Sequence, residues 1–255
     1  MATATTGTAT TGTATTGTAT TGTATTGTAT TGTATTGTAT TGTGTGGRFR
    51  ALGTLTGAVG VAFSASWITS MLVGAPMLDV DATGTAIVDT VTGREGALFA
   101  QYLFSEGLPA IGIAVISFAL ARAAATVRTA TALRALGLAA ALLSLVQFTC
   151  GAWLSASAVP NGDTGLAGTL LEVSNRGDGA KMFLLAALAL TALPVLTRRL
   201  RWTGLALAVS IAVSGLGYLL LVPALAPVAY VSGPLLLVWM TGSALAVARA
   251  ARPAA

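Results

Sequence analysis

Six apolar stretches follow one another between residues 52 and 247, each about long enough to cross a membrane as a helix. An α-helix rises about 1.5 Å per residue, so roughly 20 apolar residues span a hydrocarbon core about 30 Å thick. Only 8% of the chain is charged, whereas soluble domains typically carry about 25% charged residues. The sequence therefore predicts an all-α fold, a polytopic membrane bundle of six transmembrane helices. We expect these helices at 52–73, 97–121, 135–155, 181–197, 202–222 and 228–247.

A tract of eight identical five-residue repeats, TATTG, occupies residues 3–42. Threonine, glycine and alanine side chains bury too little apolar surface to offset the entropy of ordering the chain. A stacked β-solenoid is disfavoured, because an odd repeat length would point the threonines of alternate repeats to opposite faces of a strand. We therefore divide the chain into a disordered low-complexity tail, 1–47, and a six-helix transmembrane domain, 48–255.

Basic residues are distributed unequally between the two sides of the predicted bundle. Ten arginines flank the spans on one side, whereas the other side carries only three basic residues together with seven of the eight acids. Cytoplasmic segments of membrane proteins carry an excess of Lys and Arg. We predict a multi-pass protein of the bacterial plasma membrane, surrounded by the lipid bilayer, with both termini cytoplasmic. The net charge of +5 then reflects topology. Because the arginines lie at span ends rather than on one basic face, we exclude nucleic acid as a partner.

Three short motifs in the predicted spans carry a resemblance to a known family. They read LVQ at 145–147, SGLGYL at 214–219 and GPL at 233–235. Over about residues 48–250, the chain resembles a family of six-span bacterial integral membrane proteins that is catalogued as a domain of unknown function. The resemblance implies the six-span architecture and brings no activity, cofactor or catalytic residues. Abundant Ala, Gly, Arg and Leu with a single Lys is typical of a high-GC, actinobacterial-like source.

Residue types that support enzyme chemistry are scarce in the sequence. The chain has no His, which removes the usual proton shuttle and the commonest zinc ligand. Its single cysteine, Cys150, has no His to activate it, so we interpret it as a packing residue. The glycine-rich stretch at 53–57 lacks the Gly-Lys-Ser or Gly-Lys-Thr of a phosphate-binding loop, and its small residues favour close helix packing. We predict no enzymatic activity, no cofactor and no metal site.

Polar residues from three predicted spans share one layer. Glu106 is the only acid within an apolar span, and such residues are functional candidates because charge is costly at membrane depth. Counting the helical rise from the arginines at the span ends places Glu106, Gln147 and Lys181 about 20–26 Å from that side. Asp178 joins them if the fourth helix begins earlier than Lys181. Pro109 frees a backbone carbonyl in the same layer. We expect Glu106 to pair with Lys181, and Gln147 to donate to its second carboxylate oxygen.

The layer has two interpretations, which lead to two classes of function. It is either a structural ion pair at the headgroup boundary or a polar pocket that opens outward and accepts a small ligand or a proton. The first class is a non-enzymatic membrane module with a structural, sensing or partner-binding role, with a second copy or another membrane protein as partner. Such a module would sense the exterior through two long loops, at 74–96 and 155–179.

The second class is a small transporter or channel that uses the outward-facing polar layer around Glu106. A transporter usually shows several polar residues along one path, or a repeat-related pair of unwound helices. The inner halves of the predicted spans show neither feature in the sequence. We therefore favour the non-enzymatic module.

Overall fold

The computed structural model describes residues 43–250, with side chains described from Gly53 onward. Of the tail predicted to be disordered, 1–47, the repeat tract up to residue 42 lies outside the described residues. The rest of it, 43–47, differs from the prediction, because it forms the start of the helix Thr43–Leu72. The chain divides into two units, Met1–Phe49 and Arg50–Ala255, and the second unit contains the helical bundle.

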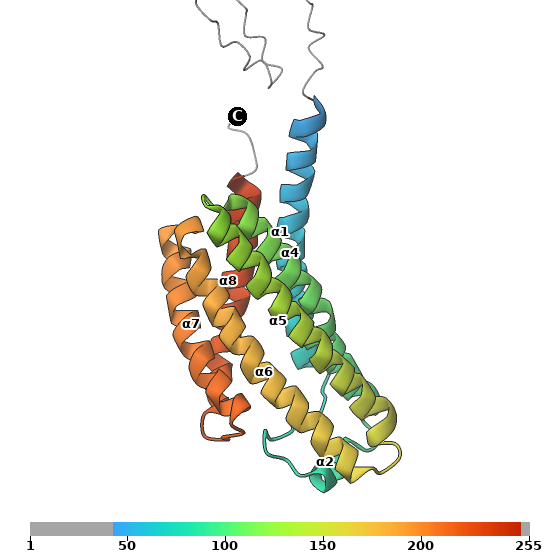
Figure 1. The fold of residues 1–255 in the computed structure, drawn as a ribbon. Helices are drawn as coiled ribbons and strands as arrows, with labels where there is room; N and C mark the ends of the chain where they lie inside the picture. The colour runs from blue at the N-terminus through green and yellow to red at the C-terminus, as the bar shows by residue number, and fades with distance from the viewer. Residues whose placement is uncertain (1–42, 251–255) are drawn as a thin grey trace, which may run out of the picture. The chain divides into compact units, whose positions relative to one another are not determined.

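Six helices in the described part of the chain are long and apolar enough to cross a membrane, as predicted (Figure 1). Within residues 43–250 there is no strand, so the all-α, six-span fold is confirmed. A short additional helix, α2, lies between the first two spans. The helices are α1 (Thr43–Leu72), α2 (Gly84–Val91), α3 (Glu95–Tyr102), η2 (Leu103–Gly107), α4 (Leu108–Ala123), α5 (Val127–Trp153), η3 (Leu154–Ala158), α6 (Thr164–Ala192), η4 (Leu193–Val195), α7 (Arg198–Leu219), η5 (Ala226–Val228) and α8 (Ala229–Ala250).

Consecutive helices of the bundle pack against one another. The contacts run in chain order from α4 to α8, and α8 also contacts α4. Thr241 of α8 ties α1 to this arrangement, because its hydroxyl lies 2.9 Å from the Gly60 carbonyl and 2.7 Å from the Ser64 hydroxyl. A Cβ added to Gly60 would lie 2.5 Å from the Cβ of Ala244. Small residues therefore allow α1 and α8 to approach closely, as is typical of membrane helix pairs.

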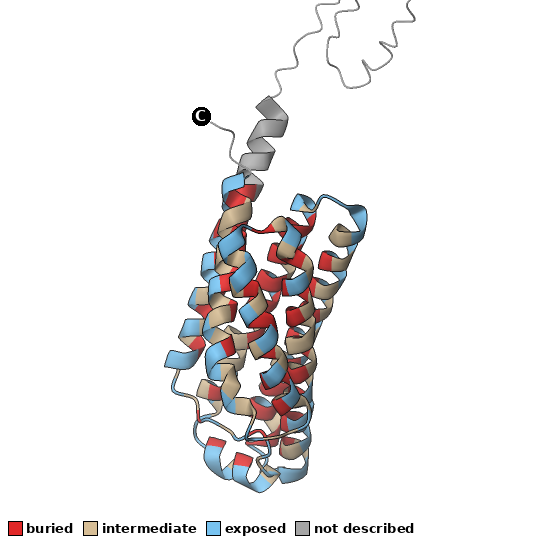
Figure 2. Cartoon of the chain, turned by 90° about the vertical axis from the view of Figure 1, so that its left-hand side faces the viewer, coloured by how far each residue is buried: buried red, intermediate tan, exposed pale blue. Residues whose placement is uncertain are grey.

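Buried apolar side chains form two clusters within the bundle. The larger cluster joins α1 with α4 to α8 and includes Ile116, Leu188 and Trp239. The second cluster joins α2, α3, η3 and the start of α6, and includes Ile87 and Leu154. Figure 2 shows the buried residues on the inward faces of the helices and many exposed residues on the outward faces. Several of the exposed residues are large and apolar, which suits faces in contact with lipid.

The two ends of the bundle differ in charge. At one end α4 leads into α5, α6 leads into α7, and α8 finishes. We call it the arginine-rich end, because it carries Arg122, Arg128, Arg134, Arg198, Arg199, Arg201 and Arg249. The opposite end, which includes α2, is called the acidic end, because it carries Asp79, Asp81, Asp89, Glu95, Asp163 and Glu172.

The fourth span begins much earlier than the sequence predicts. Its helix starts at Thr164 rather than at Lys181, and the Asp163 carboxylate caps it by accepting a hydrogen bond from the Leu166 N–H at 2.9 Å. The span has 32 residues, which corresponds to about 48 Å and exceeds a hydrocarbon core of about 30 Å. This span is therefore longer than a perpendicular crossing of the hydrocarbon core requires.

The two long loops predicted at this end both contain helix. The segment 155–179 is divided between η3 and α6, which leaves a short connection at 159–163. The segment 74–96 contains α2, which packs on α6 through the buried side chains of Ile87 and Val91. The hydropathy pattern did not predict the start of α6, because Glu172 and Arg176 lower the mean hydropathy of this segment. These two residues form an exposed i,i+4 ion pair at 2.7 Å, while the opposite face of the same turns is apolar and buried.

Candidate functional site

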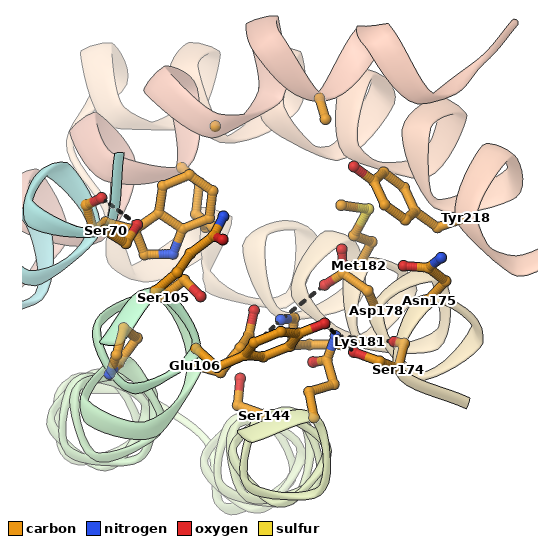
Figure 3. Close-up of a pocket in the computed structure, with 18 of the residues that line it drawn as sticks. Ser70, Ser105, Glu106, Ser144, Ser174, Asn175, Asp178, Lys181, Met182 and Tyr218 are labelled. Carbon is orange, nitrogen blue, oxygen red and sulfur yellow. Dashed lines mark hydrogen bonds and ion pairs between the residues drawn. The ribbon is translucent and has the colours of Figure 1, made fainter. Parts of the chain in front are cut away.

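A buried ion pair joins the second and fourth spans. Lys181 Nζ lies 2.6 Å from Glu106 Oε2, and the two side chains are 9% and 10% exposed. One turn earlier on α6, Asp178 Oδ1 lies 2.8 Å from the same Nζ. Two carboxylates therefore share one ammonium group inside the bundle, an arrangement that Figure 3 shows. We call Glu106, Asp178 and Lys181 the acid–lysine cluster.

Glu106 lies on an irregular turn within the second span. The helix passes through one π-helical turn, η2, in which the Leu108 N–H donates to the Leu103 carbonyl five residues earlier. A turn of this kind leaves carbonyl groups available, and Ser66 of α1 donates its hydroxyl to the Phe104 carbonyl at 2.7 Å. Single π turns occur frequently at functional sites. Here the turn places Glu106 in the interior, where the residue is 7% exposed.

Gln147 lies in the same layer but does not bind Glu106 as predicted. Its Nε2 donates instead to the Ser174 carbonyl at 3.2 Å. That donation fixes which end of the amide is the acceptor, and Oε1 has no hydrogen-bond partner among the described residues. Gln147 is 3% exposed. A buried acceptor without a donor costs about 1–3 kcal/mol, so a donor placed beside this oxygen would be favourable.

The acid–lysine cluster and Gln147 line one cavity of about 550 Å³. This volume falls within the range of roughly 300–1,000 Å³ that is typical of small-molecule sites. Phe63 and Leu185 from the larger apolar cluster line it, as do Leu98 and Leu171 from the second. The cavity therefore lies where the two apolar clusters meet. All six spans contribute to it, including Trp67, Tyr102, Gln147, Lys181, Tyr218 and Ser232.

The chain between α1 and α2 forms part of the cavity wall at the acidic end. Pro76, Met77 and Leu78 line the cavity there. Asn175 of α6 holds this segment in place by donating its Nδ2 to the Val80 carbonyl at 2.9 Å. Because Met77 lines the cavity and is also 77% exposed, the cavity opens beside this segment.

The sequence interpretation missed the aromatic residues of the site. Tyr102, four residues before Glu106, also lines the cavity, and its hydroxyl lies 3.4 Å from the Ser174 hydroxyl. The spacing of one helical turn from a buried acid was the signal that could have identified it. Tyr218 and Trp67 lie on α7 and α1, and no local pattern connects them with the acid. Their position in the site follows from helix packing.

Two further chemical features of the sequence concern metal ligands and the single cysteine. Within residues 43–250, no group of three or more His, Cys, Asp or Glu side chains could hold a metal ion. Cys150 packs in the second apolar cluster and is not among the residues that line the cavity.

Compared with protein families, curated proteins and solved structures, the chain matches none. The resemblance to a six-span family of unknown function therefore stays a prediction. Fold and site define the class of the protein: it is a multi-pass integral membrane protein with a charged cavity enclosed by its spans.

Proposed function

We propose that this chain is a bacterial plasma-membrane protein that binds a small molecule from outside the cell and acts as a sensing or partner-binding module without enzymatic chemistry. In this account both termini are cytoplasmic, because the arginine-rich end faces the cytoplasm. Its partners are the lipid bilayer and a second copy, or another membrane protein, that responds to the bound state. Nucleic acid is not a partner.

The cavity around the acid–lysine cluster is the observation that supports this function. A structural ion pair would be expected to sit in close-packed surroundings, since protein interiors contain few voids larger than a water molecule. Here the cluster borders a cavity of about 550 Å³. Buried ion pairs are also weak contributors to stability, because desolvation of the charges offsets much of their attraction. A ligand-binding role accounts for both the charges and the space beside them.

The proposed orientation places the cavity in the outer half of the membrane. Lys181 lies 17 residues before Arg198 along the chain, which corresponds to about 26 Å of helix and exceeds half of a hydrocarbon core about 30 Å thick. The opening beside Met77 then faces the exterior. Between the cavity and the arginine-rich end lies much of the larger apolar cluster, which separates the ligand from the cytoplasm.

Cysteine accessibility in intact cells tests this proposal. In a Cys150→Ala background, Asn175→Cys places one thiol at the cavity wall, and Thr131→Cys places one on the exposed surface at the arginine-rich end. A membrane-impermeant thiol reagent should modify Asn175→Cys in intact cells and Thr131→Cys only after permeabilisation. Modification of Thr131→Cys alone in intact cells would contradict the proposed access from outside.

A small transporter is the second candidate, and one observation favours it. Ser117, Ser243 and Trp239 Nε1 are buried without hydrogen-bond partners among the described residues, in the half of the bundle toward the arginine-rich end. Such polar atoms can hydrogen-bond to water molecules along a path from the cavity. Vesicles containing the protein and a pH-sensitive dye distinguish the candidates. Proton flux above that of empty vesicles, lost in Glu106→Gln, would support transport, whereas equal flux would support the binding module.

A further inference from the structure

We propose that the cavity binds a small organic ammonium compound, with its charged group beside Asp178 and Gln147 and its apolar body toward the cavity wall. This inference rests on the proposed function of the cavity as a small-molecule site. It names the chemical class of the ligand from charge, hydrogen-bonding capacity and lining.

The charge of the cavity favours a cation. Glu106, Asp178 and Lys181 are the only lining residues with acidic or basic side chains of the carboxylate, amine or guanidinium type. With all three ionised, two carboxylates and one ammonium leave a formal net charge of −1. Uncompensated charge is costly in surroundings of low dielectric constant. A ligand with one positive charge would neutralise the site, whereas an anion would add to the imbalance.

Asp178 is the member of the cluster that an incoming group reaches most easily. Its side chain is 19% exposed, compared with 9% for Lys181 and 10% for Glu106. Figure 3 shows Asp178 and Tyr218 bordering the same open space. The carboxylate can therefore accept a charge-assisted hydrogen bond from a ligand while its Oδ1 remains bound to Lys181.

Gln147 supplies an independent reason for a donor group. Its Oε1 is a buried acceptor without a partner in the described part of the chain, and the residue lines the cavity. An ammonium group carries only donors, so it matches the hydrogen-bonding needs of both this oxygen and the Asp178 carboxylate. A ligand carboxylate offers only acceptors and would leave Oε1 unpaired.

The remaining cavity wall suits an apolar ligand body. Phe63, Trp67, Ile113, Leu185 and Leu236 line it, and Tyr102 and Tyr218 lie near the charged cluster. Aromatic rings attract organic cations through their electron-rich faces, and apolar walls contact the carbon skeleton. The ligand class is therefore an ammonium compound with an apolar substituent.

Three probes of similar size separate the alternatives, using the full-length protein in detergent. They are 2-phenylethylammonium, the neutral 3-phenylpropan-1-ol and the anion 3-phenylpropionate, each measured by isothermal titration calorimetry. We expect the ammonium to bind at least about tenfold more tightly than either of the others, since hydrogen bonds to charged groups are the stronger ones. This comparison uses only the unmodified chain, so it does not depend on the folding of a variant.

Substitutions then locate the binding. Asp178→Asn should raise the Kd of 2-phenylethylammonium by about tenfold, and Gln147→Met should also raise it. Glu172→Gln is the matched control, because Glu172 lies on the same helix with a 50% exposed side chain and does not line the cavity. Its Kd should equal that of the unmodified protein.

The other outcomes overturn the inference in distinguishable ways. Equal affinity for the three probes, preference for the anion or the alcohol, or no binding by any probe would each contradict an ammonium ligand. An equal change in the Kd of 2-phenylethylammonium in Asp178→Asn and Glu172→Gln would also contradict it. Binding of the anion or the alcohol alone would contradict the ammonium ligand but still support a small-molecule site. Failure of the impermeant reagent to modify Asn175→Cys in intact cells would instead contradict the proposed function.

Discussion

Lys181 Nζ lies 2.6 Å from Glu106 Oε2, although the two residues are 75 positions apart in the chain. This contact joins α6 to the π turn of the second span, and Asp178 reinforces it from the preceding turn of α6. Lys181 is the only lysine in the sequence, and it is 7% exposed. A lysine ammonium group ordinarily contacts solvent or lipid headgroups, but that of Lys181 lies in the interior beside the cavity.

The close approach of α6 and α7 near Lys181 depends on Gly179. A Cβ at this position would lie 2.6 Å from both the Gly215 carbonyl oxygen and the Leu219 nitrogen, which are backbone atoms. We expect Gly179→Ala to lower the free energy of unfolding in detergent by about 1–3 kcal/mol, the usual cost of overpacking.

Gly96→Ala is the matched control for this prediction. No atom lies within 4 Å of a Cβ added to Gly96 on α3, and alanine favours helix more than glycine. In denaturant melts, the free energy of unfolding should therefore fall in Gly179→Ala and stay equal or rise in Gly96→Ala. An unchanged melt for Gly179→Ala would show that α6 and α7 do not touch at this level.

Reporter fusions test the proposed orientation. Fusions after Ala125 and Thr197 lie in the connections at the arginine-rich end and should report a cytoplasmic position, because this end retains the excess of arginine. Fusions after Gly93 and Gly162 lie in turns at the acidic end and should report an exterior position. A cytoplasmic signal from the fusion after Gly162 would show that the acidic end does not face the exterior.

The repeat tract is predicted to be dispensable for the bundle. Deletion of residues 2–42 retains Arg48 and Arg50, which we expect to hold the start of the first span on the cytoplasmic side. Because threonine, glycine and alanine offer little apolar surface to bury, membrane insertion and the detergent-solubilised Tm should not change. A clear drop in either quantity would show that the repeats fold or dock on the bundle.

Hydropathy was sufficient to locate most spans, because a backbone surrounded by lipid has few alternatives to the helix. The second span was predicted at 97–121 and is Glu95–Ala123. The counting that brought Glu106 and Lys181 into one layer succeeded in placing them near each other, since the rise per residue is the same in both helices. Hydropathy failed for the fourth span, where Glu172, Arg176 and Asp178 made a helix resemble a loop.

The finer geometry of the site depends on features that sequence patterns do not carry. The π turn at 103–107 shifts the residues after it by about 100° around the helix axis relative to a regular α-helix. Such a shift decides which neighbours a side chain of this span meets, and regular helical spacing does not show where it occurs. The hydrogen bond from Gln147 to the Ser174 carbonyl instead follows from the packing of α5 on α6. The cavity likewise arises from the joint packing of all six spans, and no single segment encodes it.

A charged cluster joins the second and fourth spans, and a double-mutant cycle on Glu106 and Lys181 measures whether the two residues interact. Glu106→Gln leaves Lys181 with Asp178, whereas Lys181→Met deprives two carboxylates of their ammonium. Lys181→Met should therefore destabilise the solubilised protein more, because unpaired buried charge is costly. The double variant should recover part of that loss.

The measurement is a set of four melts, on the unmodified protein, the two single variants and the double variant. Polar interactions between membrane helices average about 0.6 kcal/mol, so we expect a coupling free energy on the order of 1 kcal/mol at most, clearly different from zero. Strict additivity of the two single effects would mean that Glu106 and Lys181 do not meet and that no ion pair joins the second and fourth spans.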